Sequence, residues 1–573
     1  MKPGKMNKQH AEYLRSQANN RFANVQSTWL ECLLWAAPWR AKWMLSQQPG
    51  ERNNRHVVDS THILALRSIV AGFMEGNTSA TRPWYRIGST QVDITKDDTA
   101  HYFLDKLTRR TLQVLTSSNF YHQTGQFYYD YNVVNTGCHI VEETPTGLWF
   151  YTLVPGSYRL INDGKGEAII LIREFSFTVK ALVEEYGKTD DDGNYDWSNF
   201  SSHVKKMYEE CNYTQMVDVC EIRMKNKDFD ADRPQTLLNR QWITYTYELG
   251  ASAGSGSKVP EYMESGMYPS VDKNKWLRIS ASRRKPFIAG RSQSSNNFEY
   301  GEEGSTLSSL GLIKSLNKKA IAKDQALEQI LKPALQGPAS LKKTYVTSQS
   351  NSYVPLDAAS AQLGGLKRIN DVNPVIGPLL EDVSDLRQQV DKMYFADYLL
   401  YLSRNPKTRT ATETNAILAE QQLVIGPNLQ SLNKTYNEPI VEYVLDYVLF
   451  DDPYFNEPIP ESLQGTFLRP EFISVFAQAQ RAADLPNVDR FVAMVSEVGQ
   501  INPAIWDKVN VDRLADIYED RLYLPAGLNR PQDEVDLKRE QAVQKMDQQR
   551  LLQETIPAMA GAAKDMGFNQ GGN

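Results

Sequence analysis

Three cationic side chains lie close together in the run SRNPKTR at residues 403–409. They are Arg404, Lys407 and Arg409. On an exposed loop, guanidinium and ammonium groups can contact phosphate oxygens through charge alone, without reading any sequence of bases. A run of this composition is also an ordinary soluble turn between two helices. What it does therefore depends on the elements that flank it.

The sequence contains stretches that superficially resemble catalytic or nucleotide-binding motifs. The Gly-rich tract at residues 250–258 lacks the Gly-Lys-Ser/Thr ending of a phosphate-binding loop, and Val259-Pro260 follows it where a helix should begin. Acidic residues at 190–192 and at Asp230 and Asp232 could be imagined as nuclease metal ligands, but they lie in polar, turn-rich stretches typical of solvated acids. The seven histidines form no i, i+4 pair, and no Gly-x-Ser-x-Gly elbow occurs. We expect no catalytic residues, no metal site and no cofactor.

Composition predicts a large globular subunit. The chain has 573 residues, 41% apolar and 23% charged, which is enough for several domains and a substantial core. It has no run of eighteen apolar residues and no apolar N-terminal signal region, so neither a membrane span nor secretion is expected. Its four cysteines (Cys32, Cys138, Cys211 and Cys220) are scattered, which favours reduced thiols.

Charge is distributed unevenly along the chain. Net charge is −6, which argues against a simple nonspecific DNA-binding protein. Residues 305–410 nevertheless carry 14 Lys and Arg against 9 Asp and Glu, whereas residues 411–573 carry 13 against 25. A mildly basic segment in an acidic chain suits a protein that touches phosphates without holding them tightly. Four lysines of this segment either form the solvated face of a helix or contact phosphate: Lys314, Lys318, Lys319 and Lys323.

Long helices are predicted on both sides of the basic run. Apolar residues near a 3.5-residue period predict a helix at residues 375–402. A second apolar face predicts a helix over residues 408–444, with Thr410 and Thr412 as capping hydroxyls and Glu413 in capping-box order. Residues 305–332 are also helical by pattern, and the stretch between the helices, with short strands at 344–347 and 353–356, forms a compact excursion.

The remaining pattern is mixed. Helices are predicted at residues 8–45, 60–72, 97–116 and 178–186, and a small antiparallel sheet at 137–177. Strands are predicted within 216–247, and further helices at 470–498, 503–518 and 531–555. The aromatic cluster at residues 127–131 is interpreted as core or subunit interface, with base stacking as the alternative. The fold class is mainly α with small β elements.

The order of these features resembles the portal, or head-to-tail connector, proteins of short-tailed bacteriophages. In that family a Thr-Ala-Thr-Glu signature opens a long wing helix directly after the tunnel loop, and residues 410–413 carry the same four residues here. Other matching pieces follow in the same order along residues 26–544: Asp59-Ser-Thr61, Arg82-Pro-Trp84, Ser118-Asn119-Phe120, Tyr158-Arg-Leu-Ile161 with Arg173-Glu174, and Tyr300-Gly301 with Leu316-Asn317. The hydrophilic insert at 249–275 does not match.

The resemblance implies a division of the chain into the portal regions. Residues 1–304 would form the wing, 305–335 and 374–402 the two stem helices, and 336–373 the clip. Residues 403–409 would be the tunnel loop, 410–465 the wing helix and a crossing, and 466–573 the crown with a flexible tail. Lys342, Lys343 and Tyr345 would dock partners from the clip, and the tunnel loop with the stem lysines would face DNA.

It also implies partners and a place. A dodecameric ring at the capsid vertex of the virion, assembled in the host cytoplasm, would pass double-stranded DNA during packaging and ejection. Terminase, a tail adaptor, and the major capsid and scaffolding proteins would contact it, and no membrane would. Two alternatives remain open on the sequence: a packaging- or tail-associated enzyme such as a nuclease or muralytic protein, and a ring-forming head–tail adaptor.

Overall fold

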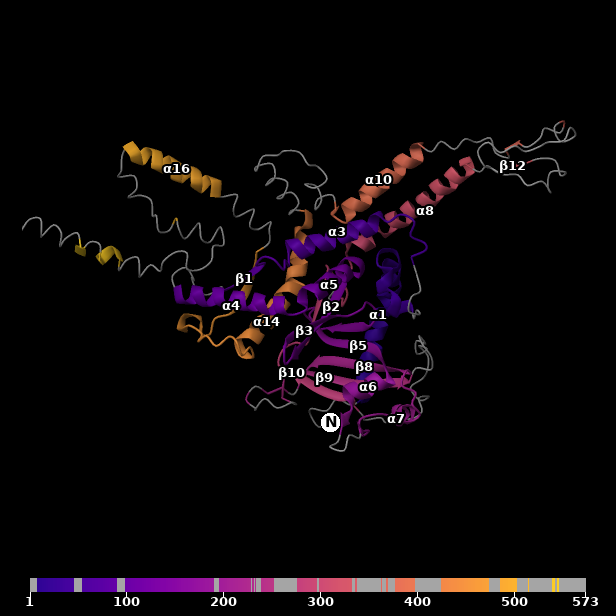
Figure 1. Cartoon of the computed structure of the whole chain (residues 1–573), viewed down its shortest axis with the longest axis horizontal. Coiled ribbons are helices and arrows are strands. Elements are labelled where there is room, and N and C mark those ends of the chain that lie inside the picture. Colours follow the sequence, from indigo (N-terminus) through magenta and orange to yellow (C-terminus); the bar gives the residue numbers. More distant parts are fainter. Residues whose placement is uncertain are drawn as a thin grey trace, which may run out of the picture. The chain divides into compact units, whose positions relative to one another are not determined.

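The computed structural model divides the chain into two compact units. One comprises residues 1–83 and 112–447, and the other residues 84–111 and 448–573. The described residues are 8–45, 54–89, 98–189, 195–227, 229–230, 232, 239–251, 276–295, 298–331, 335–336, 362, 367–368, 377–396, 424–473, 485–501, 514, 538–541 and 544–545. Helices predominate and the sheets are small, so the predicted fold class is confirmed (Figure 1).

A five-stranded antiparallel sheet is the largest β element of the first unit. Its strands lie in the order β10-β9-β8-β5-β4. Their bounds are β4 Tyr158–Asn162, β5 Ala168–Thr178, β8 Met216–Lys225, β9 Trp242–Ala251 and β10 Arg278–Ser282. Tyr158 pairs with Arg173 in the register, so the strand pair expected from the resemblance is present.

Helices cover both faces of this sheet. The long helix α1 (Lys8–Ala36) buries Ala11 and Ala18 against Ile172 and Ile222. The opposite face carries Val217 and Val219, which pack on α6 (Val179–Tyr186) and α7 (Ser202–Glu209). Successive side chains of β8 therefore point to opposite faces of the sheet and pack in two separate hydrophobic cores, as strand geometry requires. Helix α1 ends before Pro38, where η1 (Pro38–Arg40) and α2 (Lys42–Leu45) follow.

A second, three-stranded sheet has the order β11-β2-β3. Its strands are β2 Thr136–Thr144, β3 Gly147–Thr152 and β11 Phe287–Arg291. Helix α5 (Phe120–Val134) packs against it. The sequence predicted one sheet over residues 137–177, but the turn after β3 divides these strands between two sheets, and that prediction is corrected here. Helices α5 and α7 were also missed.

Asn119 closes the free edge of β3. Its side-chain Oδ1 accepts a hydrogen bond from the backbone N–H of Phe150, and its Nδ2 donates to the Phe150 carbonyl, both at 2.8 Å. The amide therefore takes the place of a neighbouring strand at that residue and protects an edge that would otherwise be open to pairing. This gives a physical role to Asn119, one of the residues in the resemblance.

The second unit is built around a β ribbon. Strand β1 (Tyr85–Ser89) pairs antiparallel with β14 (Leu468–Phe472), which lies far along the chain. The register pairs Tyr85 with Phe472, Ile87 with Pro470 and Ser89 with Leu468. Residues 98–111 of α4 (Asp98–Ser117) cover it, and Thr108 Oγ1 accepts from the N–H of Ile87 at 3.0 Å. Arg110 binds both carboxylate oxygens of Asp452, at 2.6 and 2.9 Å. Helix α16 (Leu485–Ile501) also belongs to this unit.

Candidate functional site

Two helices of the first unit, α8 (Ser305–Leu331) and α10 (Gly377–Met393), pack against each other (Figure 1). The Thr306 hydroxyl at the start of α8 lies 2.8 Å from the hydroxyl of Tyr394, just after α10. Further along α8, Lys319 forms an ion pair with Asp382 near the start of α10. The helices therefore run antiparallel, as the predicted helices at 305–332 and 375–402 would in a hairpin.

The four predicted basic residues of α8 have different surroundings. Lys314 forms an ion pair with Glu31 of α1, and Lys319 pairs with Asp382 of α10. Lys323 lies 3.6 Å from its neighbour Asp324, and Lys318 is exposed. Three of the four ammonium groups thus already have a carboxylate partner within the subunit, which lowers the positive field that this helix presents to a polyanion.

The positive charge surplus of residues 305–410 lies outside helices α8 and α10. Over residues 305–331 and 377–393 the chain has six Lys and Arg and six Asp and Glu. The excess of basic residues counted over 305–410 therefore comes from residues 332–376 and 394–410, which include both predicted basic sites. The net positive charge of residues 305–410 therefore lies outside α8 and α10.

Both helices of the pair are hydrogen-bonded to a loop that precedes α3 (Thr61–Gly76). Asn317 of α8 accepts hydrogen bonds from the N–H groups of Val58 and Asp59, at 2.8 and 2.9 Å. Arg387 of α10 donates to the carboxylate of Asp59, whose other oxygen accepts from the N–H and hydroxyl of Thr61. Asp59-Ser-Thr61 and Asn317 were separate pieces of the resemblance, and the structure brings them together.

Asp59 is held in its charged form. Burial by itself would raise the pKa of this carboxyl, but hydrogen bonds from Thr61 and Arg387 outweigh it and hold the pKa below its ordinary value. The carboxylate is almost fully buried, whereas Arg387 is half exposed. Arg387 therefore covers the solvent-facing side of Asp59 in a small polar junction between α3, α8 and α10.

The predicted wing helix is interrupted by a π-helical turn. Residues 424–432 are α-helical, η4 (Asn433–Asn437) is a π-helix, and α14 runs from Glu438 to Phe450. Pro439 has no N–H and its ring would clash with the carbonyl four residues earlier in a regular helix. The wider π turn relieves that clash. The prediction of a uniform α-helix is therefore wrong in this stretch, and Pro439 was the available signal.

The π turn directs Tyr436 into the three-stranded sheet. Its ring stacks on Phe127, with centroids 3.7 Å apart and planes at 11°. Its hydroxyl lies 3.1 Å from His139 Nδ1, and His139 Nε2 lies 2.7 Å from the hydroxyl of Thr152, which itself donates to the Gln123 carbonyl. A neutral imidazole with its proton on Nε2 satisfies this chain of hydrogen bonds. Burial lowers the pKa of His139 to about 3, in agreement with the neutral form.

A buried ion pair supports the same region from the other side of α5. Arg40 of η1 donates from Nε to Asp130 Oδ1 at 2.8 Å and from Nη2 to Oδ2, and it also reaches the Leu153 carbonyl. Both side chains are almost fully buried. Phe127, Tyr128 and Tyr131 in the aromatic cluster are buried as well, so core packing is confirmed for them.

Most of the predicted contact residues lie outside the described residues. These are Arg404, Lys407 and Arg409 of the tunnel loop, Lys342, Lys343 and Tyr345 of the clip, and Thr410, Thr412 and Glu413 of the wing-helix signature. The strands predicted at 344–347 and 353–356 also lie outside them. At the start of the predicted clip, β12 (Leu335–Gln336) pairs with β13 (Lys367–Arg368).

The structure also bears on the acidic and cysteine residues. Asp230 accepts from the N–H of Asp232 at 3.1 Å and bonds to Asn239, as in a polar turn. The described part of the chain holds no group of three or more His, Cys, Asp or Glu side chains placed to bind a metal. All four cysteines are free thiols, as predicted. Among the helices that are described, none has the length and apolarity to cross a bilayer.

Comparison with known proteins agrees with the resemblance. Residues 8–528 match the model of the bacteriophage head to tail connecting protein family. A probable portal protein of Bordetella phage BPP-1 is 28% identical over 516 residues, which are 90% of this chain and 86% of that protein. The portal protein of Salmonella phage epsilon15 is 27% identical over 529 residues, with coverage of 92% and 89%.

Two solved structures were also similar over much of their length. A chain of a native gene transfer agent virion aligns with a TM-score of 0.33 at 8% identity, covering 81% of this chain and 91% of its own. A chain from the neck of an empty gene transfer agent particle aligns with a TM-score of 0.35 at 10% identity, covering 80% and 95%. At these scores the structural likeness adds nothing to the assignment. The family model, however, spans nearly the whole sequence, and the chain therefore belongs to the family of bacteriophage head to tail connecting proteins.

Proposed function

We propose that the chain is a portal subunit, copies of which form a closed ring at one vertex of the capsid and pass DNA through an axial channel. The observation that carries the proposal is the family match over residues 8–528, together with two relatives named as portal proteins over about nine-tenths of this chain. A heterologous interface that repeats and closes gives a ring. The ring would be dodecameric, a component of the virion, and assembled in the host cytoplasm.

Exposed apolar side chains on the helix pair support assembly. At the end of α8, Ile330 and Leu331 are 40% and 74% exposed, and Leu380 near the start of α10 is 51% exposed. Apolar side chains gathered at one end of a helix pair are a feature of protein interfaces. In the proposed ring, α8 and α10 are the stem helices, and neighbouring copies cover these residues.

The proposed mechanism is structural and electrostatic. Arg404, Lys407 and Arg409 form the tunnel loop that faces the bore, and residues 336–373 form the clip, with Lys342, Lys343 and Tyr345 docking the terminase and later the tail adaptor. Lys318 and Lys323 are the stem lysines with the weakest links to acids within the subunit, so they are the stem candidates for DNA contact. The acidic surplus after residue 410 keeps DNA from binding tightly.

The other regions follow the same assignment. Residues 1–304 form the wing, 410–465 the wing helix and crossing, and 466–573 the crown, where capsid and scaffolding proteins would meet the ring. ATP hydrolysis belongs to the separate terminase. The chain itself is non-enzymatic in this proposal, in keeping with the structural role that the family name describes.

Imaging of the purified protein tests the proposal. Negative-stain electron microscopy should show rings with a central hole, and mass measurement should give a multiple of the subunit mass. A folded protein that is monomeric at all concentrations would contradict it. An assay for Mg²⁺-dependent DNA cleavage separates the enzyme alternative, because a portal subunit should leave duplex DNA intact.

A further inference from the structure

Ring and guanidinium contacts join β3, β5 and α6 into one row in the first unit. The guanidinium carbon of Arg173 lies 4.9 Å from the ring centroid of Tyr151 and 4.3 Å from that of Phe175. The Phe175 ring meets Phe177 edge-on at 5.3 Å, and Phe177 meets Tyr186 in the same way at 6.0 Å. We call these five residues the aromatic row. The proposed portal mechanism gives the row no role.

The β3 end of the aromatic row is open to solvent. Trp149 lies two residues before Tyr151 on the same face of the strand, and the two residues are 53% and 41% exposed. The alternate residues Leu148, Phe150 and Thr152 are buried, and their face of β3 packs on α5. The two exposed rings are therefore not part of the α5 core. Aromatic rings beside an arginine are typical of surfaces that bind another protein.

Arg173 lacks a carboxylate partner within the described part of the subunit. The acid opposite it in the β5–β8 register is Glu221, but Glu221 binds Arg223 of its own strand instead. Glu142 of the neighbouring sheet binds Arg223 as well. Among the described residues, the contacts of the Arg173 guanidinium are thus the two aromatic rings. Stacking on rings uses the faces of a guanidinium and leaves its in-plane N–H groups for an oxyanion such as a carboxylate.

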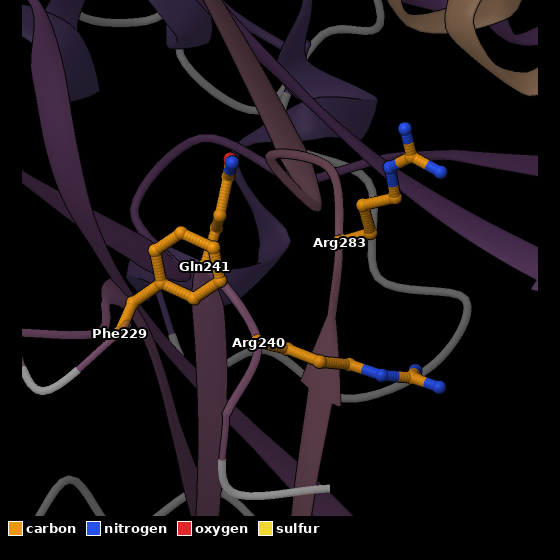
Figure 2. Close-up of a pocket in the computed structure, with 4 residues that line it drawn as sticks. All are labelled: Phe229, Arg240, Gln241 and Arg283. Atoms are coloured by element: carbon orange, nitrogen blue, oxygen red, sulfur yellow. The ribbon is translucent and has the colours of Figure 1, made fainter. Parts of the chain in front are cut away.

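A small cavity elsewhere in the first unit offers no comparable set of donors. It lies where the β9–β10 ladder ends, beyond the pair of Ser282 with Trp242, and its volume is about 130 Å³. Phe229, Arg240, Gln241 and Arg283 line it, and Figure 2 shows both guanidinium groups and the Gln241 amide pointing apart. The aromatic row is therefore the stronger candidate for a binding surface.

The charges around the aromatic row favour a protein carboxylate over a nucleic acid as the partner group. Arg278 contacts the Tyr186 ring at 4.9 Å, but it already pairs with Glu185 at 3.1 Å. The side chains of Glu142, Glu184 and Glu185 are all more than half exposed. Nucleic-acid binding depends on several phosphate contacts at once, and here exposed acids accompany a single unpaired guanidinium. One carboxylate with apolar groups beside it fits these surroundings better.

We propose that the aromatic row is a contact surface for a second copy of this chain, whose carboxylate binds Arg173 while its apolar side chains cover Trp149 and Tyr151. The proposal rests on the ring proposed above, in which each copy needs two different surfaces that fit each other. The chain carries 69 acidic against 63 basic residues, so a neighbouring copy is rich in carboxylates. The exposed ends of α8 and α10 supply contacts between stems, and the aromatic row supplies one between the sheet-bearing parts of the subunits.

Cross-linking with a carbodiimide tests the proposal in full-length rings, because this reagent joins an amine to a carboxylate in direct contact. Arg173→Lys keeps the positive charge and places an amine where the neighbour's carboxylate is expected. Rings assembled from isotopically labelled and unlabelled chains show whether a link joins two copies or lies within one. We expect peptides of mixed isotope content in which the introduced lysine is joined to an Asp or Glu. Arg278→Lys is the matched control: Glu185 of the same chain lies beside it, so its link should stay within one chain.

A second measurement does not depend on cross-linking. Arg173→Glu and Trp149→Ala should each raise the protein concentration at which rings dissociate by about tenfold or more. Lys180→Glu makes the same change of charge at an exposed position on α6 and should leave that concentration within about twofold. Circular dichroism checks that each variant is folded.

Failure of this surface can be told apart from failure of the portal proposal. Rings that form but give no link between copies from Arg173→Lys, or that dissociate at an unchanged concentration in both Arg173→Glu and Trp149→Ala, would overturn the surface and leave the portal proposal standing. Absence of rings from the wild-type protein would overturn both. Binding of a single-stranded oligonucleotide that Arg173→Glu abolishes, with ring dissociation unchanged, would assign the aromatic row to nucleic acid instead.

Discussion

The Asp59 carboxylate and the Arg387 guanidinium, 328 residues apart in the chain, form two hydrogen bonds of 2.9 and 2.8 Å. Both reach the same oxygen, Oδ2, while Oδ1 is occupied by Thr61. Because Asn317 binds the backbone of the same loop, one short segment before α3 holds both α8 and α10. In the proposed portal, this junction fixes the stem helices to the body of the subunit.

Replacing Arg387 by Met should destabilise the fold. The substitution leaves the almost fully buried Asp59 carboxylate with only its hydrogen bonds from Thr61, and the loss of its cation should cost at least about 1–3 kcal/mol. Urea unfolding followed by circular dichroism measures the change. Lys392→Met on the exposed face of α10 is the control and should change stability by less than about 0.5 kcal/mol. Equal effects of the two substitutions would show that the junction contributes nothing.

The same junction should be sensitive to acid. The folded-state pKa of Asp59 lies below its ordinary value, so its contribution is fully present above the unfolded-state pKa and is lost as pH falls through the folded-state pKa. Asp59→Asn should remove that part of the pH dependence and lower stability at neutral pH. Unfolding curves of both proteins at pH 7 and pH 3 test this: their difference in free energy should be smaller at pH 3.

His139 should contribute a second acid dependence at higher pH. Its pKa of about 3 in the folded protein lies below the ordinary value of 6.5, so the unfolded chain takes up a proton first as pH falls. Stability should therefore decline from about pH 6.5 downward, by roughly 2 kcal/mol between pH 7 and pH 5 from this group alone. His139→Gln should flatten the dependence in that window. His10→Gln, at a position early in α1 and far in sequence from this network, should leave the slope unchanged.

The buried pair of Arg40 and Asp130 should behave as one unit. Arg40→Met alone leaves a buried unpaired carboxylate and should cost about 3–5 kcal/mol. The double variant Arg40→Met with Asp130→Leu removes both charges and should be markedly more stable than Arg40→Met alone. Chemical denaturation of the wild type, both single variants and the double variant gives the coupling energy. Additive single effects would contradict the pairing.

Sequence patterns located the elements that are amphipathic or bounded by strong signals. Helix α8 was expected over residues 305–332 and runs from Ser305 to Leu331, whereas the helix expected over residues 8–45 is interrupted at Pro38 and α1 ends at Ala36. Helix α5 was missed because it has no clear polar face. Phe127, Tyr128, Asn132 and Val133 are all buried, so its sequence lacks the repeat of apolar and polar positions that predicts an amphipathic helix. Helix α7 was missed for another reason: it is only eight residues long and buries just Val204 and Met207, which is too short a pattern to predict a helix.

Long-range pairs could not be derived from local spacing. The contact of His139 with Tyr436 depends on a π turn that shifts the helix register by one residue, and Pro439 signals a disruption without saying which side chain it turns inward. The lysines of α8 look like one basic row in the sequence, but Glu31 and Asp382 come from two other helices to pair with them. Family resemblance supplied the order of the pieces, and only the structure supplied their partners.

Two glycines should respond in opposite directions to alanine. At Gly290 of β11, a Cβ would lie 2.5 Å from the Phe127 ring and 2.9 Å from Tyr436 Cβ, so Gly290→Ala must displace the stacked pair and should destabilise by about 1–3 kcal/mol. At Gly311 of α8 no atom lies within 4 Å of the added Cβ, and Gly311→Ala should stabilise the exposed helix position by about 0.5–1 kcal/mol. Thermal unfolding of both variants checks the contrast. Stabilisation by Gly290→Ala would contradict the close packing of the π turn on the sheet.

Arg404, Lys407 and Arg409 form the proposed tunnel loop. Exposed cations contribute little energy singly and are screened by salt, so their role should be to retain DNA in the bore rather than to hold the ring together. Changing all three to Ser should leave ring assembly and capsid incorporation normal and shorten the genome retained in particles. The triple change of Lys314, Lys318 and Lys319 to Ser removes the same charge from α8, but Lys314 and Lys319 already pair within the subunit, so its effect on retention should be smaller. Packaged genome length, measured by gel electrophoresis of DNA from purified particles, compares the two. Full genomes in the first variant would rule out the tunnel-loop assignment, and loss of rings would place these three residues at the interface between copies instead.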